Sequence, residues 1–533
     1  MQSFRNELKK EFDKKESYRE CLFKRGYLIS DRDIESLDEY PFYSNWSKTN
    51  IGKWKCYIHN DQSIYTSTDS KITVALIGHA YNPFTMQYDE QELLKDCIEA
   101  YKESKKCYFE KISEFTGIHV VCLFDETDDS VMIVQDCCGM LSCFYGKADD
   151  YVYITDYPQL IADICDLKMD EFVEKLINSK CYHIGNRHLP GDLSPYKEIK
   201  RLGGNTYLHY KNAFKVERFY PNEPHPEFKT QEEFKDGVAK IASLIKNGIE
   251  CCTHKWNKRT ISLSGGTDSK TTLACANGLY DKFSYFSFHS KPTELVDATA
   301  AKKICDKLKI KHTFYEIPQQ NEDIEDFDFW KKLLEHNTNY IKGLADNEIR
   351  KYVYLYKLNC YDIELKSWAS EVARVFLERK YCIKMPEVLS ERHFSIFQTR
   401  YFAHPFLLKK SDRIYREFMK KTDLTQTKFN FEHTDMFYWE VRMGAWGTSV
   451  VSSQNLYHHV TMPMNNRKIL EIFLSFPHDL RKSDQVHKWV MEYANNDVLE
   501  SKEEVKNLYF HSYRIWMEKI YYLYRTLFYR RMK

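Results

Sequence analysis

The chain has 533 residues, which is too long for one hydrophobic core, because single cores stop growing at roughly 250 to 300 residues. Its 78 Lys and Arg balance 77 Asp and Glu, so no long-range field attracts nucleic acid or an anionic membrane. The 16 cysteines include no CxxC pair, which indicates reduced thiols and not zinc ligands or a disulfide framework. We therefore expect two domains in a cytoplasmic protein that does not bind nucleic acid.

No segment of the chain predicts a membrane span. The N-terminus lacks an apolar stretch, and no later window offers the roughly 18 apolar residues that a span requires. The tail 514–533 mixes basic and aromatic residues on successive helical turns. It fits either a helix on a membrane surface or a packed C-terminal helix, and we favour the second interpretation.

Short apolar runs bounded by turn residues dominate before residue 220. They read KITVALIGHAYN from Lys71, TGIHVVCLFDETDDSVMIVQD from Thr116 and DDYVYITDY from Asp149. Such runs predict antiparallel strands and hairpins, with DETDD and KADD at the turns. The N-terminal domain is therefore expected to be rich in antiparallel β-structure.

A proline-rich segment, YPNEPHPEFKTQEEF at 220–234, separates this part from the rest of the chain. Its prolines cannot continue a helix or a central strand, so we place the domain boundary near residue 222, giving domains 1–222 and 223–533. Beyond it, strand and helix patterns alternate. This alternation predicts an α/β domain with a parallel sheet covered on both faces.

The segment most informative about chemistry reads RTISLSGGTDSKTTLACANGL from Arg259. Residues 260–263 predict a buried strand, and a helix is predicted from Lys270. The loop between them consists of Ser264, Gly265, Gly266, Thr267, Asp268 and Ser269.

This loop has the chemistry of a phosphate site. Its glycines let backbone amides approach phosphate oxygens, and the start of the helix adds unpaired N–H groups and a positive dipole end. Ser264 and Ser269 can donate hydrogen bonds to the same oxygens, and Asp268 can hold the magnesium that neutralises a pyrophosphate leaving group. The GxxxxGK[ST] spacing of a Walker loop is absent. The loop predicts ATP and Mg²⁺ as cofactors.

The loop resembles the SGGxDS loop of ATP pyrophosphatases, and residues 230 to about 495 resemble the synthetase domain of the asparagine synthetase family. The next strand candidate, KFSYFSFHS, and a helix with Ala300, Ala301, Ile304 and Leu308 on one face follow in the family's order. The resemblance implies an ATP-pyrophosphatase domain, similar to adenine nucleotide α-hydrolases and carrying extra helices. It also implies that Leu263 and Ser287 lie against adenine. We favour structural roles for Asp297 and His312.

The family's second motif is represented by IELKSWASEVARVF, with Ser370 and Glu371 at its serine and carboxylate positions but without its glycines. A magnesium ligand and an ordinary helix-surface glutamate remain equal alternatives for Glu371. Lys270, where asparagine synthetases usually have Ser, does not favour asparagine as the product. Trp368, at the position of a tyrosine in relatives, does not favour an intramolecular β-lactam-forming enzyme.

Lys488 aligns with a family lysine that steadies charge at the adenylate. It lies in the segment PMNNRKILEIFLSFPHDLRKSDQVHKWVMEY. A cation aimed at developing negative charge would stabilise the transition state. The alternative is an exposed helix lysine, with Arg374 and Arg467 as the next candidates for the catalytic cation.

The N-terminal half resembles the glutamine amidotransferase domain that precedes the synthetase domain in this family. ALIGHAYN places Asn82 at the asparagine of an oxyanion hole, and VQDCCGMLSCFYG places Asp136 and Gly139 in a second family segment. The nucleophile of that class is a cysteine directly after the initiator Met, whereas residue 2 is Gln. We expect no glutaminase activity and a scaffold role for this amidotransferase-like sandwich.

The resemblance implies an AMP-forming carbon–nitrogen ligase. It would convert a carboxylate and MgATP to an acyl-adenylate and pyrophosphate, and then transfer the acyl group to ammonia or an amine. The expected partners are a small-molecule or peptide carboxylate and an amine donor, with no membrane, and a homodimer is left open. The alternatives are a peptide or glycan-carboxylate amidoligase of the same family and a non-catalytic pseudoenzyme partner.

Overall fold

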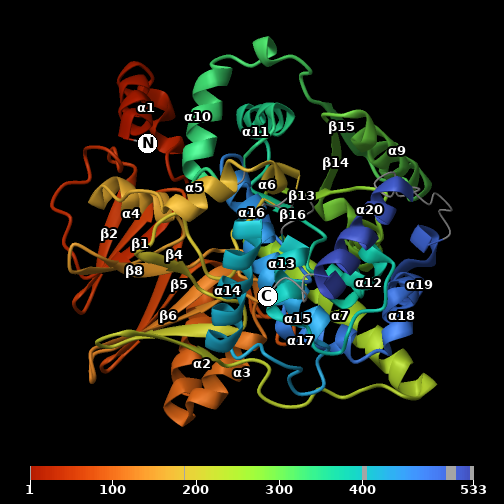
Figure 1. The fold of residues 1–533 in the computed structure, drawn as a ribbon. Helices are drawn as coiled ribbons and strands as arrows, with labels where there is room; N and C mark the ends of the chain where they lie inside the picture. Colours follow the sequence, from red (N-terminus) through yellow and green to blue (C-terminus); the bar gives the residue numbers. More distant parts are fainter. Residues whose placement is uncertain (1, 185–186, 342, 399–404, 500–511, 529–533) are drawn as a thin grey trace.

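A computed structural model describes the chain except for residues 1, 185–186, 342, 399–404, 500–511 and 529–533 (Figure 1). Its N-terminal part contains two antiparallel six-stranded sheets, in the orders β10-β8-β9-β1-β3-β2 and β12-β11-β7-β6-β5-β4. The strands are β1 Tyr27–Ser30, β2 Trp46–Ile51, β3 Trp54–His59, β4 Ile64–Asp69, β5 Ile72–Tyr81, β6 Thr116–Asp125, β7 Ser130–Gln135, β8 Phe144–Ala148, β9 Tyr151–Thr155, β10 Ile199–Arg201, β11 Thr206–Tyr210 and β12 Phe214–Arg218. The predicted antiparallel strands and the two hairpin turns are confirmed.

Alternation along the strands of the first sheet explains how it is covered on both sides. In β3, Cys56 and Ile58 join the core shared with the second sheet, whereas Tyr57 between them joins a separate apolar cluster. Successive side chains of a strand point to opposite faces, so each face can bury its own set. The cluster on the second face includes Trp330 of α10 (Phe327–Asn337) and Tyr352 of α11 (Asp346–Leu358).

The C-terminal part is built on a five-stranded parallel sheet in the order β15-β14-β13-β16-β17. The strands are β13 Arg259–Ser262, β14 Ser284–His289, β15 His312–Glu316, β16 Ile363–Leu365 and β17 His459–Thr461. The chain adds β14 and β15 on one side of β13 and then β16 and β17 on the other. The strand order therefore reverses between β13 and β16, which is where open α/β sheets bind ligands.

Helix α7 (Gln231–Lys255) opens this part with a capping box. The Thr230 hydroxyl accepts a hydrogen bond from the Glu233 N–H at 3.2 Å, and the Glu233 carboxylate accepts from the Thr230 N–H at 2.8 Å. This pair satisfies two N–H groups that a helix start leaves unbonded. The proline-rich segment lies between β12 and α7, where we predict the boundary. The cores of the two parts are continuous, since Tyr81 and Ile261 belong to one apolar cluster.

The remaining helices cover the two sheet systems (Figure 1). They are α1 Gln2–Lys14, α2 Glu90–Glu103, α3 Lys105–Ser113, α4 Pro158–Cys165, α5 Glu171–Ile177, α6 Lys180–Ile184, α8 Thr267–Cys275, α9 Pro292–Lys307, α12 Phe376–Tyr381, α13 Glu391–Gln398, α14 Pro405–Lys421, α15 His433–Met436, α16 Thr448–Gln454, α17 Arg467–Leu474, α18 His478–Lys482, α19 Gln485–Leu499 and α20 Ser512–Leu523. Short 3₁₀ turns include η4 Ser370–Ala373, and π-helical segments are η5 Phe437–Gly447 and η6 Tyr524–Phe528.

The predicted C-terminal helix is present as α20, as far as residue 528 is described. Tyr522 is buried, with ring centroids 6.1 Å from Tyr381 and 6.4 Å from Phe397, whereas Trp516 and Ile520 are exposed. The helix therefore packs on the body of the protein through one face. None of the described helices combines the length and the apolar character that crossing a membrane would need.

Candidate functional site

The loops that follow β13 and β16 meet at one edge of the parallel sheet. The two strands are neighbours in parallel register, with Ile261 opposite Leu365. Both strands therefore end at the same edge, and the chain segments after them lie beside each other. This topology brings the phosphate loop to the residues of the second motif, which are about a hundred positions away in the sequence.

The phosphate loop folds back on the first turn of α8. The Ser264 and Ser269 hydroxyl oxygens are 2.9 Å apart, and the Gly266 N–H donates to the Ser264 hydroxyl at 3.3 Å. Helix α8 begins at Thr267, three residues before the predicted start at Lys270, so Asp268 lies in its first turn. No side chain caps this helix. Its first N–H groups are therefore available to an anion, and the positive dipole end favours one.

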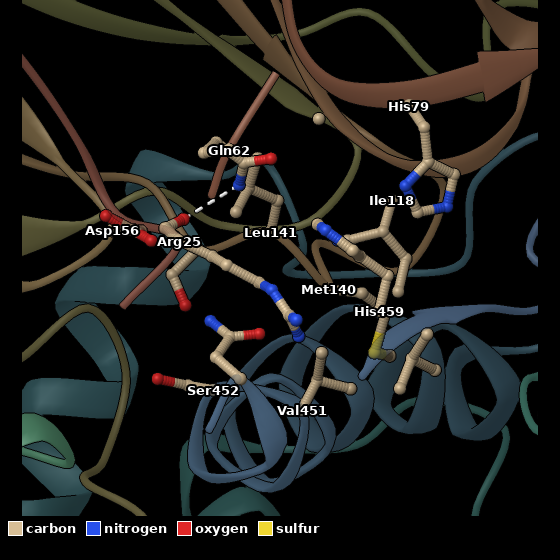
Figure 2. A pocket seen from close by; sticks show the side chains of 14 residues that line it. Arg25, Gln62, His79, Ile118, Met140, Leu141, Asp156, Val451, Ser452 and His459 are labelled. Carbon is tan, nitrogen blue, oxygen red and sulfur yellow. Dashed lines mark hydrogen bonds between the residues drawn. The ribbon is translucent and has the colours of Figure 1, made fainter. Parts of the chain in front are cut away.

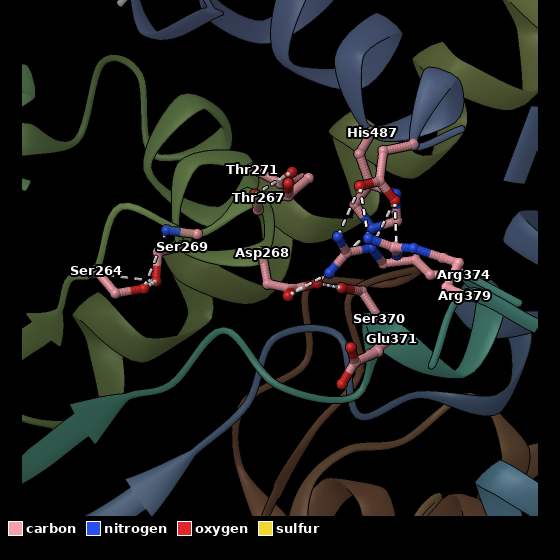
Figure 3. A network of polar contacts seen from close by, with 12 residues as sticks. Ser264, Thr267, Asp268, Ser269, Thr271, Ser370, Glu371, Arg374, Arg379 and His487 are labelled. Carbon is pink, nitrogen blue, oxygen red and sulfur yellow. Dashed lines mark hydrogen bonds and ion pairs between the residues drawn. The ribbon is translucent and has the colours of Figure 1, made fainter. Parts of the chain in front are cut away.

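Asp268 is tied to the segment after β16 (Figure 3). The Ser370 hydroxyl donates to Asp268 Oδ1, and Arg374 Nη1 donates to Asp268 Oδ2 at 2.8 Å. The side chain of Asp268 remains 28% exposed, so a ligand can still reach the carboxylate. The sequence-predicted loop residue and the predicted second motif thus form one polar cluster.

Arg374 also forms a bidentate ion pair with Asp484, through Nε at 2.8 Å and Nη2 at 2.7 Å. Arg379 adds two further contacts to the same carboxylate, at 3.0 and 3.2 Å. Burial opposes ionisation of Asp484, but the hydrogen bonds and charge of Arg374 outweigh it and lower the pKa of Asp484. The pKa of the Arg374 guanidinium is raised: burial disfavours its charge, but the carboxylates of Asp268 and Asp484 more than offset that cost.

His487 of α19 completes the cluster. Its Nε2 lies 4.0 Å from Asp268 Oδ1, and its ring stacks on Phe473 with centroids 4.9 Å apart. Burial, together with the charge of Arg374, lowers the pKa of His487 to about 4. The imidazole is therefore neutral near neutral pH, and neither ring nitrogen has a hydrogen-bond partner among the described residues. Sequence reasoning missed this residue and Asp484, although both lie in the segment that contains Lys488.

The predicted metal ligand Glu371, the predicted catalytic cation Lys488 and the two reserve cations lie in different surroundings. Glu371 is partly exposed and accepts a hydrogen bond from the Tyr438 hydroxyl at 2.7 Å. Lys488 is exposed on α19, one position beyond His487. Arg467, one of the reserve candidates, is wrong as a cation near the loop, because its guanidinium is buried against Asn205 and the backbone oxygens of Gln135 and Asp136. Arg374, the other reserve candidate, lies at the loop.

The residues predicted to lie against adenine are adjacent. The Ser287 hydroxyl donates to the Leu263 carbonyl at 2.7 Å and lies 3.0 Å from His312 Nε2. The Leu263 N–H donates to the Phe286 carbonyl, so both main-chain groups of Leu263 already have protein partners. His312 therefore has a structural contact, as expected. Asp297 lies at the loop itself: burial raises the pKa of its carboxyl, and a hydrogen bond from the Gly265 backbone opposes the rise.

The carboxylates fit a magnesium ion in number and kind. Both oxygens of Asp268 accept one hydrogen bond each, which leaves lone pairs for a hard cation. Among the residues that the structure describes, no group of three or more His, Cys, Asp and Glu could hold a metal. Magnesium usually takes only one or two protein carboxylates together with substrate phosphates and water. Asp268 and Glu371 would be those carboxylates.

A small cavity of about 30 Å³ lies between the sandwich and α16 (Figure 2). Its lining includes Gly78 and His79 of the segment ALIGHAYN, together with Arg25, Asp156 and His459. Burial lowers the pKa values of both histidines well below their ordinary range and raises that of Asp156 well above its own. Arg25 Nη1 and His79 Nε2 have no partner within the described part of the chain. The space suffices for about two water molecules.

Asn82, at the family's oxyanion-hole position, has its side chain bound within the protein. Its amide nitrogen donates to Glu114 at 3.0 Å, and its amide oxygen accepts from the Phe84 N–H at 2.9 Å. Asn82 does not line the cavity. These two bonds hold the turn after β5, and the amide nitrogen carries a second N–H besides the one that Glu114 accepts. The positions that face the cavity are Gly78 and His79, earlier in the same segment.

Comparison with solved structures gives weak overall likenesses. Glutamine phosphoribosylpyrophosphate amidotransferase from B. subtilis, complexed with ADP and GMP, is 11% identical with a TM-score of 0.23, over 51% of this chain and 60% of that one. The allosteric regulatory enzyme of purine biosynthesis is 11% identical with a TM-score of 0.24, over 50% and 60%. The matched region thus spans 60% of each of these chains. No curated protein sequence matches the chain.

The family comparison falls on the phosphate loop. The profile described as asparagine synthase matches residues 240–340. The matched segment runs from within α7 through β13, the loop, α8, β14, α9 and β15 to the end of α10. It therefore contains the loop and the adjacent strands that carry the predicted nucleotide contacts. Residues 240–340 therefore match the asparagine synthase family model, in agreement with the resemblance seen in the sequence.

Proposed function

We propose that the chain is an AMP-forming carbon–nitrogen ligase of the asparagine synthase type, which adenylates a carboxylate and transfers the acyl group to ammonia or an amine. The observation that carries the proposal is the position of Asp268. It lies in the first turn of α8, directly after a Ser-Gly loop, at a helix start without a side-chain cap among the described residues. Ser370 and Arg374, which follow the neighbouring strand β16, both donate hydrogen bonds to it. Exposed N–H groups beside an anchored carboxylate suit a magnesium-bound pyrophosphate.

The loop residues and their neighbours have separate roles in this proposal. The loop amides and the hydroxyls of Ser264 and Ser269 would hold the leaving pyrophosphate, because donors aimed at developing charge stabilise a transition state. Asp268 and Glu371 would hold Mg²⁺, which supplies charge neutralisation at the phosphates when bound. Leu263 and Ser287 would border adenine.

The catalytic cation at the acyl group has two candidates, Lys488 and Arg374. Lys488 is exposed on α19 and has a flexible stem that can reach a bound ligand, whereas Arg374 is buried and already paired. Arg374 therefore serves best to fix Asp268, and we keep Lys488 as the catalytic cation. Arg374 sets the geometry of the loop, and Lys488 stabilises the charge at the acyl group.

The test is magnesium-dependent exchange of labelled pyrophosphate into ATP, measured with a panel of amino acids, dicarboxylates and aromatic carboxylates. Exchange that depends on one class of carboxylate is the expected result, and Asp268→Asn should reduce it by about a hundredfold or more. The exposed Asp281, whose side chain is 72% accessible and pairs with Lys282, provides the matched control as Asp281→Asn. Full exchange by Asp268→Asn would refute the assignment of the loop.

The proposal includes the absence of glutaminase activity. We expect the cavity near His79 not to hydrolyse glutamine, because none of the described residues that line it is a cysteine, the nucleophile of that enzyme class. Incubation with glutamine should release no glutamate above the buffer rate. Glutamate release that a thiol alkylator stops would contradict this part of the proposal.

A second candidate function is a non-catalytic nucleotide-binding partner. It is favoured by one observation, the Arg374–Asp268 ion pair, since a cation already neutralises the carboxylate predicted to bind magnesium. This candidate expects MgATP binding with a normal dissociation constant and no exchange with any carboxylate. Calorimetric titration with MgATP, run beside the exchange assay, separates the two.

A further inference from the structure

A partly exposed arginine lies next to the second motif and is not used by the function proposed above. It is Arg442, in the π-helical segment Phe437–Gly447. π-helical turns are rare and frequently occur at functional sites. The segment brings Tyr438, Arg442 and Trp446 to one side, facing the residues that follow β16.

Aromatic rings surround the Arg442 guanidinium. Its Cζ lies 4.5 Å from the centroid of Trp446, 4.9 Å from Phe376 and 5.7 Å from Tyr438. These cation–π contacts hold the group in place. Nε and Nη1 are nevertheless buried without a hydrogen-bond partner among the residues that the structure describes. A desolvated donor on a charged group costs free energy until an acceptor arrives.

This guanidinium is connected to the phosphate loop by a short series of contacts. Tyr438, under Arg442, donates its hydroxyl to Glu371 at 2.7 Å, and the adjacent Ser370 donates to Asp268. Arg442 thus lies two side-chain contacts from the proposed magnesium ligand Glu371. Arg442 is therefore linked to the neighbourhood of the loop through Tyr438 and Glu371.

Flat aromatic surface continues the wall beyond Arg442. The Trp368 and Trp446 rings are stacked, with centroids 5.8 Å apart and an interplanar angle of 23°. Both side chains are partly exposed, as are Glu371 and Phe376. Trp446 already contacts the Arg442 guanidinium and the Trp368 ring, so the surface offers the remaining exposed parts of the two indoles, against which planar rings can pack.

The neighbouring lysine does not share the unmet demand of Arg442. Lys366 pairs with the buried carboxylate of Glu364, which also lies 2.6 Å from His458 Nε2. The charge of Lys366 is therefore balanced locally. Near the indole wall, Arg442 is the cation whose buried donors lack acceptors in the described part of the chain.

We propose that Arg442 and the Trp446–Trp368 wall bind an anionic group and the flat body of the acyl substrate, so that the substrate class is a planar, aromatic or unsaturated carboxylate. This proposal rests on the proposed ligase function for the meaning of the word substrate. A guanidinium recognises a carboxylate because its planar donors match the two oxygens. An aliphatic or neutral compound would lack one of the two contacts.

The test uses fluorine NMR with para-fluorobenzoate as the probe and para-fluorobenzamide as its neutral counterpart, both without ATP. Broadening and displacement of the benzoate signal, with weaker effects on the amide, are expected for the wild-type chain. Arg442→Gln and Trp446→Leu should each weaken benzoate binding by about tenfold or more. Arg442→Lys keeps the charge but not the planar fork and should weaken binding by less than Arg442→Gln.

Arg413→Gln is the matched control, because the Arg413 side chain is 69% exposed and forms an ion pair with Glu417 one turn later on the same helix. Circular dichroism and the melting temperature verify that each variant folds, and Arg442→Lys serves if Arg442→Gln does not. Equal binding of benzoate and benzamide would overturn the proposal. Unchanged benzoate binding by Arg442→Gln would also overturn it. Where Arg442→Gln does not fold, Arg442→Lys takes its place in this comparison. Benzoate binding that depends on Arg442 without pyrophosphate exchange would sustain this site and reject the ligase function, so the two failures are distinguishable.

Discussion

Arg374 Nη1 donates to Asp268 Oδ2 at 2.8 Å, and this bond joins the helix of the phosphate loop to the turn after β16. The opposite side of the same guanidinium holds Asp484 through two further bonds. A single buried cation in the turn after β16 therefore links the loop carboxylate to Asp484, which directly precedes α19. Ion pairs as well as packing hold Asp268 and Asp484 in place, so removing the charge of Arg374 should destabilise the fold.

Arg374→Met should lower the free energy of unfolding by about 3 kcal/mol, because it leaves Asp268 without its guanidinium partner and Asp484 with Arg379 alone in a largely buried site. Equilibrium unfolding in urea measures the change. Arg413→Met, at an exposed helix position, is the comparison and should cost less than about 0.5 kcal/mol. A loss of the same small size at Arg374 would show that the cluster is solvated.

Glu371→Gln should raise the magnesium concentration that half-saturates pyrophosphate exchange, since an amide oxygen binds a hard cation less strongly than a carboxylate. The Tyr438 hydroxyl donates to Glu371, so Tyr438→Phe should produce a smaller shift in the same direction by loosening the carboxylate. Magnesium titration of all three proteins gives the order. A dependence that neither substitution alters would make Glu371 an ordinary surface residue.

His487 should make the fold sensitive to acid. Its pKa is about 4 in the folded chain and about 6.5 when unfolded. As the pH falls from about 6.5 to about 4, the unfolded chain takes up the proton first, so the free energy of unfolding falls. His487→Phe keeps the stack on Phe473 and should recover about 2 kcal/mol of the stability lost between about pH 7 and about pH 5.

Urea unfolding at those two pH values checks this prediction, with His254→Phe as the comparison at an exposed helix position. The other buried histidines still contribute in every variant, so the difference between the two pH values is the quantity to compare. An identical loss of stability in wild type and His487→Phe would mean that His487 does not titrate as proposed.

The strand, loop and helix around Asp268 could be predicted because their signals are local. A short apolar run, two glycines and a helical pattern follow each other within about twenty residues, and each is readable without tertiary context. The helix start differed by three residues, because an acidic first turn looks like a loop when no capping side chain marks it.

The partners of Asp268 could not be predicted in the same way. Arg374 is 106 positions from Asp268 in the chain, and the two meet because β13 and β16 are neighbours in the sheet. His487 and Lys488 are adjacent in sequence, but a helix turns by about 100° per residue, so only one of them faces the cluster. Which one does so depends on how α19 packs. The π-helical segment has no sequence signal that separates it from an α-helix.

Lys488→Met is the sharpest test of the proposed chemistry at the acyl group. Lys488 is exposed on α19, so its removal opens no buried site and tests whether its long side chain carries the ammonium to a bound adenylate. If it stabilises charge that develops only in the transition state, its loss should lower kcat by about a hundredfold to a thousandfold and leave the KM for ATP unchanged. Methionine retains the apolar stem, which separates loss of charge from loss of packing.

Lys482→Met is the matched control on the preceding helix, where the lysine pairs with Glu378 at 2.8 Å. Amide formation at the wild-type rate in Lys488→Met would show that Lys488 is a solvated helix lysine, and would move the role to Arg374.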